Sequence, residues 1–169
     1  CTEQQAKVSS GRSKFRIMGM QDHEFPNLPL FTQNEACVVE QKLLAKMLKQ
    51  VSYSHSTDEN RYLLNGVLFT FKTSENKTSL TLVATDGRRL SLCEEGVDGQ
   101  ISTESAEFIL PAKSVAELER LLQNTAPVKI YFNDKQVAFD LGLEPSAVDS
   151  GLVDSIYLVS KKVEGRFPN

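Results

Sequence analysis

Residues 80–92 read LTLVATDGRRLSL, in which two runs of alternating apolar and polar residues flank the pair Asp86-Gly87. Alternation with a period of two is typical of a strand that buries one face. An Asp-Gly pair between two such runs is a strong signal for a tight turn, because glycine adopts positive φ without steric cost. The stretch therefore predicts two antiparallel strands joined by a turn at 85–88.

The residues before this hairpin predict a strand, a helix and another strand. Residues 36–39 form a short β-rich run. Residues 41–52 carry Leu44, Met47, Leu48 and Val51 at helical spacing, which predicts a helix with one buried stripe. Residues 62–71 are apolar at odd and even positions alike, as in a strand covered on both faces.

The residues after the hairpin repeat this order. A strand at 108–110 precedes a helix at 115–123, for which Ser114 is the expected N-cap with Glu117 three residues later. A hairpin at 128–132 and 136–141 and a last strand at 156–159 follow. The chain thus reads as two β-α-β-β-β halves. Two isolated helices among antiparallel strands indicate the α+β class, with the helices packed on antiparallel sheets.

Residues 24–29 predict a domain boundary, because Pro26 and Pro29 remove backbone donors and restrict their neighbours. We expect a short strand at 15–18 before this boundary and a main domain formed by residues 28–169 after it. The chain starts at Cys1 without a methionine and stops abruptly at residues 167–169, so we expect it to be part of a longer protein.

The composition is that of an ordinary folded domain. Of 169 residues, 40% are hydrophobic and 24% charged, which excludes disordered, collagen-like and disulfide-dense proteins. A net charge of −3 argues against a protein whose whole surface binds nucleic acid. No apolar run approaches the roughly 20 residues that span a bilayer. Three cysteines without metal-type spacing fit a reducing cytoplasm.

The sequence assembles no catalytic, metal or cofactor site. His23 and His55 lie about thirty residues apart without a cysteine or carboxylate at ligand spacing, so we interpret them as solvated loop residues. Phosphate-binding and nucleophile-elbow motifs are missing. Asp86 beside Arg88 and Arg89 could act as a general base on a phosphorylated substrate, but its place in a hairpin turn already gives it a structural reason.

Charges are segregated along the chain. Lys42, Lys46 and Lys49 share one face of the first predicted helix, either as a solvated face or as contacts to a phosphate backbone. Tyr62 is likewise either a half-buried strand residue or an exposed ring for a nucleic acid. Residues 140–154 carry four acidic residues and no basic ones.

Five stretches, in order, resemble the bacterial β sliding clamp family, the processivity subunits of DNA polymerase III. Residues 84–90, ATDGRRL, are similar to its A-T-D-G-x-R-L signature, and residues 61–68, RYLLNGVL, to its R-x-x-L-N-G-x-L strand. Residues 108–113, FILPAK, resemble the start of the second half of its middle domain, and residues 163–169, VEGRFPN, its end. Residues 10–15, SGRSKF, and 24–28, EFPNL, resemble the end of its first domain and the connector, which implies that residues 1–27 belong to that domain. The third domain is not represented.

This resemblance implies a non-catalytic subunit, without a cofactor, that closes a homodimeric ring around duplex DNA in the bacterial cytoplasm and near the nucleoid. The fragment alone is expected to be monomeric. Helices would line the hole, so that Lys42, Lys46, Lys49 and Tyr62 face DNA while the acidic 140–154 stretch lies away from it. Weak, sequence-independent phosphate contacts suit a ring that slides.

The resemblance also implies a cleft for short linear peptides of the polymerase α subunit, the clamp loader and other partners. Carried over by motif, its wall in this chain consists of Leu64, Thr85, Gly87, Arg88, Arg89, Leu90 and Pro168. Leu64 and Leu90 could equally be core residues. The alternative function is a clamp-like module that binds partner peptides without encircling DNA.

Overall fold

The computed structural model describes residues 5–20, 24, 36–75, 77–98, 105–123, 125–142 and 156–168. The chain divides into two compact units, Cys1–Leu30 and Phe31–Asn169. Within the described residues, no helix is long and apolar enough to cross a membrane. The predicted linker at 25–29 and most of the acidic stretch, residues 143–154, lie outside the described residues.

The first unit contains an antiparallel hairpin of β1 (Gln5–Ser10) and β2 (Ser13–Met18). Its register pairs Ala6 with Ile17 and Val8 with Phe15, so apolar side chains share one face, while Lys7 and Arg16 pair on the other. Phe15 is 60% exposed.

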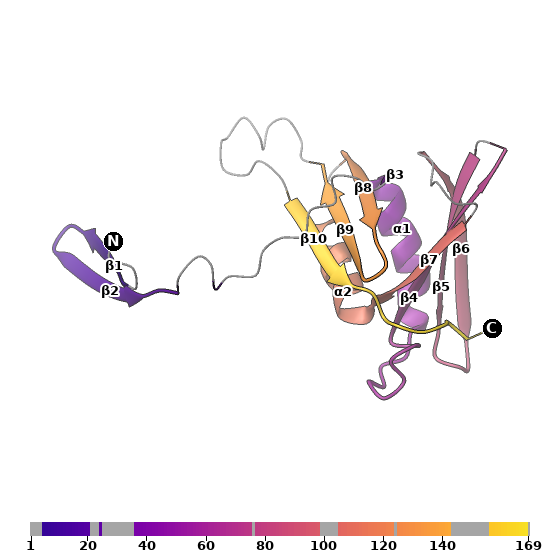
Figure 1. Cartoon of the computed structure of the whole chain (residues 1–169), viewed down its shortest axis with the longest axis horizontal. Helices are drawn as coiled ribbons and strands as arrows, with labels where there is room; N and C mark the ends of the chain where they lie inside the picture. The colour runs from indigo at the N-terminus through magenta and orange to yellow at the C-terminus, as the bar shows by residue number, and fades with distance from the viewer. Residues whose placement is uncertain are drawn as a thin grey trace. The chain divides into compact units, whose positions relative to one another are not determined.

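The second unit contains two four-stranded antiparallel sheets, with strand orders β10-β9-β8-β3 and β6-β5-β4-β7 (Figure 1). The first half of the unit comprises β3 (Ala36–Glu40), α1 (Gln41–Val51), the 3-10 turn η2 (Ser52–Ser54), β4 (Gly66–Ser74), β5 (Lys77–Thr85) and β6 (Leu90–Val97). The second half comprises β7 (Ser105–Pro111), α2 (Ala112–Leu121), β8 (Pro127–Phe132), β9 (Gln136–Leu141) and β10 (Ile156–Lys161). The predicted α+β fold of two β-α-β-β-β halves is confirmed.

Each half contributes its first strand to the sheet of the other half. β3 pairs with β8, whereas β7 pairs with β4. Sequence periodicity does not show this exchange, because it arises from pairing between distant residues. The two halves are therefore interlocked.

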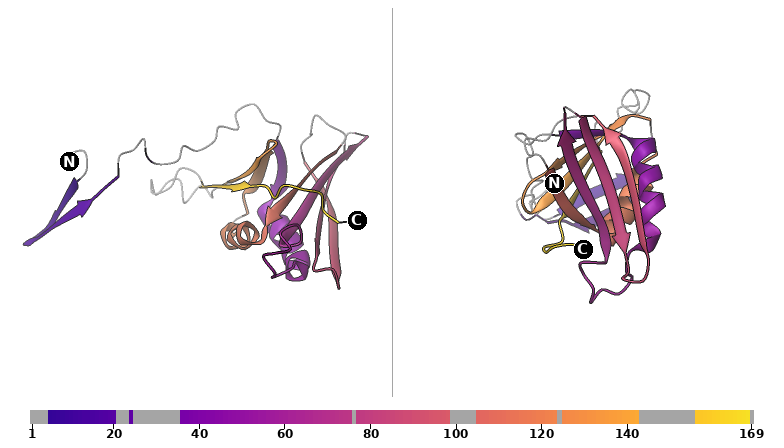
Figure 2. Two further views of the ribbon diagram at one scale, coloured as in Figure 1. Left: turned by 60° about the horizontal axis from the view of Figure 1, so that its bottom comes forward. Right: turned by 90° about the vertical axis from the view of Figure 1, so that its right-hand side faces the viewer.

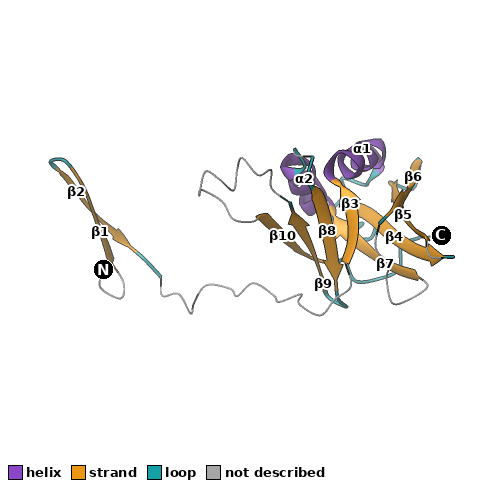
Figure 3. Cartoon of the chain, turned by 90° about the horizontal axis from the view of Figure 1, so that it is seen from above, coloured by secondary structure: helices purple, strands orange, loops and turns teal. Residues whose placement is uncertain are grey.

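Both helices lie side by side on one side of the sheets (Figure 3). The α1 stripe of Leu44, Met47, Leu48 and Val51 is fully buried, as predicted. The core also holds an aromatic cluster: Phe69 stacks on Phe108 with ring centroids 5.0 Å apart and meets the edge of Phe139 at 6.1 Å. Since Phe69 and Phe139 come from different sheets, one core serves both halves.

Two local predictions are wrong. The predicted strand at 62–71 begins only at Gly66, because residues 61–65 form turns in which the N–H groups of Leu64 and Asn65 donate to the carbonyl of Arg61. Tyr62 is consequently a loop residue. Ser114 does not cap its helix: α2 begins at Ala112, directly after β7.

Candidate functional site

The β5–β6 turn at 85–90 is ordered by its own side chains. Thr85 Oγ1 donates to the carbonyl of Arg89 at 2.6 Å and accepts the N–H of Gly87 at 3.0 Å. Gly87 has φ +86°, a conformation in which an L side chain would be strained. The turn predicted from Asp86-Gly87 is confirmed, and hydrogen bonds within the turn hold its shape.

Asp86 holds the turn together. Its Oδ1 accepts the backbone N–H groups of Arg88 at 2.9 Å and Arg89 at 3.0 Å, while Oδ2 accepts Nε of Arg89 at 3.1 Å. The hydrogen bond from the Arg88 backbone, followed by that from Arg89, lowers the pKa of the Asp86 carboxyl. A carboxylate with a lowered pKa and both oxygens engaged is a poor general base. The arrangement supports a structural role for Asp86.

Arg89 links this turn to η2, the 3-10 turn that follows helix α1. Its Nη2 donates to the backbone carbonyl of Tyr53 at 2.9 Å, and its guanidinium carbon lies 5.8 Å from the centre of the Tyr53 ring. The Tyr53 hydroxyl accepts a hydrogen bond from Ser91 at 2.8 Å. Hydrogen bonds with Ser91 and then Ser54 lower the pKa of Tyr53. The Arg89 side chain is thus oriented by three groups.

Arg61 connects the turn to the loop that carries Leu64. Its Nη1 donates to the carbonyl of Asp86 at 3.2 Å. Leu64 is half-buried, whereas Leu90 is 63% exposed. A core role for Leu90 is therefore wrong. Sequence reasoning did not single out Arg61 or Tyr53 as site residues, although Arg61 opens the R-x-x-L-N-G stretch that pointed to this site.

The segment after β10 reaches the same end of the β6-β5-β4-β7 sheet (Figures 1 and 2). The N–H of Val163 donates to the carbonyl of Ile109 at 3.0 Å, which fixes the segment to β7. Gly165, at φ +130°, lies so close to Leu63 that a Cβ there would clash with the leucine side chain. The exposed Pro168 follows three residues later. The loop at residues 61–65, the turn at 85–90 and the segment at 162–168 thus lie at the same end of the β6-β5-β4-β7 sheet.

The α1 lysines occupy the solvent side of the helix. Lys42, Lys46 and Lys49 are all exposed, opposite the buried stripe. Nζ of Lys46 lies 3.5 Å from Oε1 of Glu95, so its charge is partly balanced. Tyr62 is 60% exposed, on a loop that projects beyond the C-terminal end of α1 (Figure 1). Its alternative as a half-buried strand residue is wrong.

The remaining candidates form no second site. His55 lies 2.9 Å from the carbonyl of Ser56 through Nδ1, and His23 lies outside the described residues. No group of three histidine, cysteine or carboxylate side chains in the described ranges could hold a metal ion.

Residues 38–169 match the family model for the central domain of the DNA polymerase III beta subunit. The chain is 29% identical over 167 residues to a beta sliding clamp of Chlamydia muridarum, covering 97% of this chain and 40% of the relative. It is 27% identical to a beta sliding clamp of Staphylococcus aureus, covering 98% of this chain and 39% of that one. The chain thus spans about two fifths of these relatives.

Solved structures show the same fold. The sliding clamp of Bacillus subtilis superposes with a TM-score of 0.81 at 26% identity, over 100% of this chain and 40% of that one. The DNA polymerase III subunit beta of Pseudomonas aeruginosa superposes with a TM-score of 0.80 at 26% identity, over 100% of this chain and 42% of that one.

Proposed function

The chain belongs to the DNA polymerase III beta subunit family, and from this premise we propose that its whole protein is a sliding clamp. In this proposal the protein is a non-catalytic subunit that encircles duplex DNA as a head-to-tail homodimer and tethers the polymerase. Residues 28–169 form its middle domain and residues 1–27 end the first one. As in any bacterial replication machinery, it would act in the cytoplasm, on the nucleoid.

The observation that carries the proposal is the preorganised turn beside an exposed apolar side chain. Leu90 offers 63% of its surface to solvent at a turn that Thr85 and Asp86 already hold rigid. A surface that is rigid before binding loses little conformational entropy on binding. This combination suits a cleft that receives short peptides.

The other proposed cleft residues complement Leu90. Leu64 and Pro168 add apolar surface, and Gly87 lets a partner backbone approach because it has no side chain. Arg88 is exposed and free of ion pairs in the described residues, so it can meet a carboxylate or carbonyl of the peptide. Arg89 is held by Asp86 and Tyr53, so it would shape the cleft more than reach into it.

The exposed lysines of α1 support the DNA-facing part of the proposal. A rigid helix that presents Lys42, Lys46 and Lys49 on one face offers point charges to phosphates without reading bases. Glu95 competes for Lys46, so we expect Lys42 and Lys49 to contribute more. Tyr62, on its projecting loop, would contact DNA from beyond the end of the helix.

The cleft is tested by titrating a Q-L-x-L-F peptide into the full-length protein and two variants. Leu90→Ala should weaken peptide binding about tenfold or more, the usual cost of truncating an apolar anchor. Leu92→Ala is the matched control, because Leu92 is 60% exposed two residues along the same strand but outside the proposed cleft. Equal effects of the two changes, or none, would contradict the cleft.

The DNA contact is tested by charge reversal in the full-length protein loaded on circular duplex DNA. Changing Lys42, Lys46 and Lys49 to Glu should shorten retention and reduce its salt dependence, since each lost phosphate contact lowers the logarithmic salt slope by about 0.9. The control reverses Lys72, Lys77 and Lys129, which are exposed on strands instead. If both triple variants retain DNA like the parent, the α1 lysines are a solvated face and do not contact DNA. If the unchanged full-length protein itself is not retained on DNA while peptide binding persists, the alternative of a peptide-binding module is favoured.

A further inference from the structure

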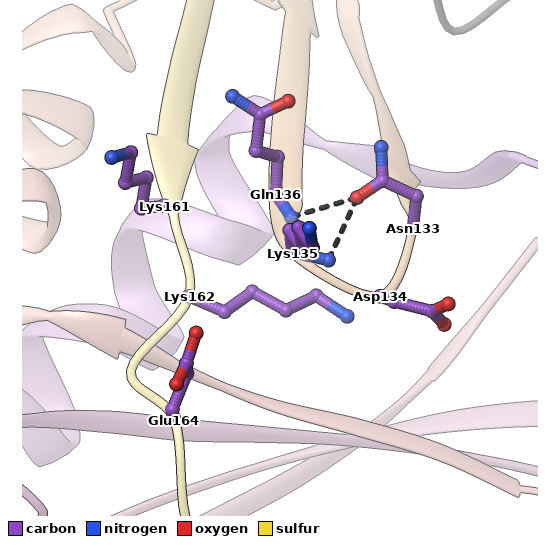
Figure 4. A pocket seen from close by; sticks show the side chains of 7 residues that line it. All are labelled: Asn133, Asp134, Lys135, Gln136, Lys161, Lys162 and Glu164. Atoms are coloured by element: carbon purple, nitrogen blue, oxygen red, sulfur yellow. Dashed lines mark hydrogen bonds between the residues drawn. The ribbon is translucent and has the colours of Figure 1, made fainter.

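Two adjoining cavities lie where the β8–β9 turn meets the segment that follows β10. Figure 4 draws the residues that line the larger of the two. One, of about 550 Å³, is lined by Asn133, Asp134, Lys135, Gln136, Lys161, Lys162 and Glu164. The other, of about 310 Å³, shares Asp134, Lys135, Lys162 and Glu164 with the first. None of the lining residues belongs to the proposed cleft or to the proposed DNA contacts.

The walls of these cavities are firmly held. In the β8–β9 turn, Oδ1 of Asn133 accepts the N–H groups of Lys135 at 2.9 Å and Gln136 at 2.8 Å (Figure 4). The N–H of Lys162 donates to the carbonyl of Lys135 at 3.0 Å, which joins the turn to the segment after β10. A ligand would therefore meet a preformed surface.

Lys162 is an unusual cation within this surface. Its Nζ lies 5.4 Å from the ring centres of both Phe108 and Phe132. Partial burial lowers the pKa of Lys162, and the charge of Asp134 only partly opposes this. Nevertheless, no carboxylate oxygen of the described residues lies within ion-pair distance of it. An ammonium that has lost part of its water gains more from an incoming anion than an exposed lysine does.

The smaller cavity supplies the apolar half of a site. Beyond the shared charged residues, its lining includes Leu68, Phe108, Ile109 and Phe167. An apolar side chain placed here would lie a few ångströms from an anion placed on Lys162, because the two cavities share that residue.

The charged residues that line the two cavities disfavour the binding of polyanions. Asp134, Glu164 and Glu107 line the cavities together with Lys135, Lys161 and Lys162. A nucleic-acid backbone or polyphosphate would meet these three carboxylates as well as the lysines, and like charges at close range repel. A single carboxylate attached to an apolar group meets less of this repulsion, because it carries one charge that can be placed on Lys162.

We propose that the two cavities form one binding site for a short peptide segment of a partner protein in which an acidic residue adjoins a bulky apolar one. The peptide carboxylate accepts a hydrogen bond from Nζ of Lys162, and the apolar side chain packs on Leu68 and Phe167. Such charge-assisted hydrogen bonds are about twice as strong as neutral ones.

The test uses the whole 169-residue chain, labelled with ¹⁵N, and two capped dipeptides, acetyl-Phe-Asp-amide and acetyl-Phe-Asn-amide. The Asp peptide should shift the amide signals of residues 133–136 and 161–167 and bind about fivefold or more tightly than the Asn peptide, which lacks the charge. Lys162→Met keeps the apolar stem over the rings and should remove this preference. Lys129→Met, on exposed β8 surface outside the cavities, should leave it unchanged.

Three results would overturn the proposal. They are equal binding of the two dipeptides, shifts confined to other residues, and stronger binding of inorganic phosphate than of the Asp peptide at Lys162. Thermal unfolding of the variants checks their fold. If Lys162→Met does not fold, the difference in affinity between the two dipeptides for the unchanged chain tests the proposed site instead.

Discussion

Asp86 shows how much one side chain determines in the candidate site. Its two oxygens orient the backbone at Arg88 and Arg89 and the guanidinium of Arg89, which in turn contacts Tyr53. A single carboxylate thereby connects the β5–β6 turn to η2, which follows α1. The same hydrogen bonds that make Asp86 unsuitable as a base make it an effective organiser of the turn.

We expect Asp86→Asn to reduce the pH dependence of the unfolding free energy under acidic conditions. Hydrogen bonding lowers the pKa of Asp86 below its usual value of 3.8 in the folded state. The stabilisation it gives is therefore present above that value and is lost as the pH falls through the lower folded-state pKa. The parent should be more stable than Asp86→Asn near neutral pH, and this difference should shrink below pH 3.8.

Urea denaturation at about pH 6 and about pH 2.5 measures this difference. Asp134→Asn is the matched control, because in its turn the backbone N–H groups donate to Asn133 instead. A gap between parent and Asp86→Asn that stays constant across this pH range would contradict the role given to the carboxylate.

At the residue scale, the sequence predicted what depends on neighbours along the chain. The turn at Asp86-Gly87 follows from local dihedral preferences and short-range hydrogen bonds, so it could be read directly. The contacts of Arg89 with Tyr53 and of Arg61 with Asp86 join residues 36 and 25 positions apart. No local sequence pattern encodes such contacts. Tyr53 and Arg61 were therefore not predicted as residues of the candidate site.

At the element scale, the helix α2 shows why a capping pattern can mislead. Ser114 and Glu117 have the spacing of a capping box, but the helix starts at Ala112, whose N–H donates to the carbonyl of Asn65 at 3.1 Å. The Ser114 hydroxyl lies 2.7 Å from that of Ser160 in β10 instead. Partners distant in sequence, one from a loop and one from β10, thus replaced the local cap, and only the tertiary structure supplies them.

The pairing of β4 with β7 depends on Gly66. A Cβ at this position would collide with the backbone carbonyl oxygen of Leu110 and lie 3.2 Å from Cγ2 of Ile109. Because the obstructing oxygen belongs to the paired strand, it cannot move without opening the sheet. We expect Gly66→Ala to destabilise the domain by about 1–3 kcal/mol, as overpacked sites do.

Urea denaturation also measures this effect, with Gly96→Ala as control. Gly96 lies in the edge strand β6, has ordinary φ, and a Cβ there would meet nothing within 4 Å. Its replacement should change stability by no more than about 0.5 kcal/mol. Similar effects of both changes would show that β4 and β7 do not approach as closely as described.

At the scale of the whole molecule, the exchange of first strands between halves has a thermodynamic consequence. The sequence predicted two halves with the same order of strands and helix, and this is confirmed. It did not predict that β3 and β7 would each complete the sheet of the other half. A half that lacks one strand of its sheet and part of its core cannot fold alone. The two halves should therefore unfold together.

Phe139→Ala tests this cooperativity. Phe139 is fully buried on β9 and meets Phe69 of the other sheet edge to face. Its truncation should cost about 3–5 kcal/mol and lower the midpoint of one shared transition. Calorimetry should find equal calorimetric and van't Hoff enthalpies for residues 31–169 in parent and variant.

The control is Phe15→Ala, in the separate hairpin unit. It should leave that transition unchanged, since Phe15 is 60% exposed and belongs to Cys1–Leu30. Two resolved transitions within residues 31–169 would mean that the halves fold independently despite the exchanged strands.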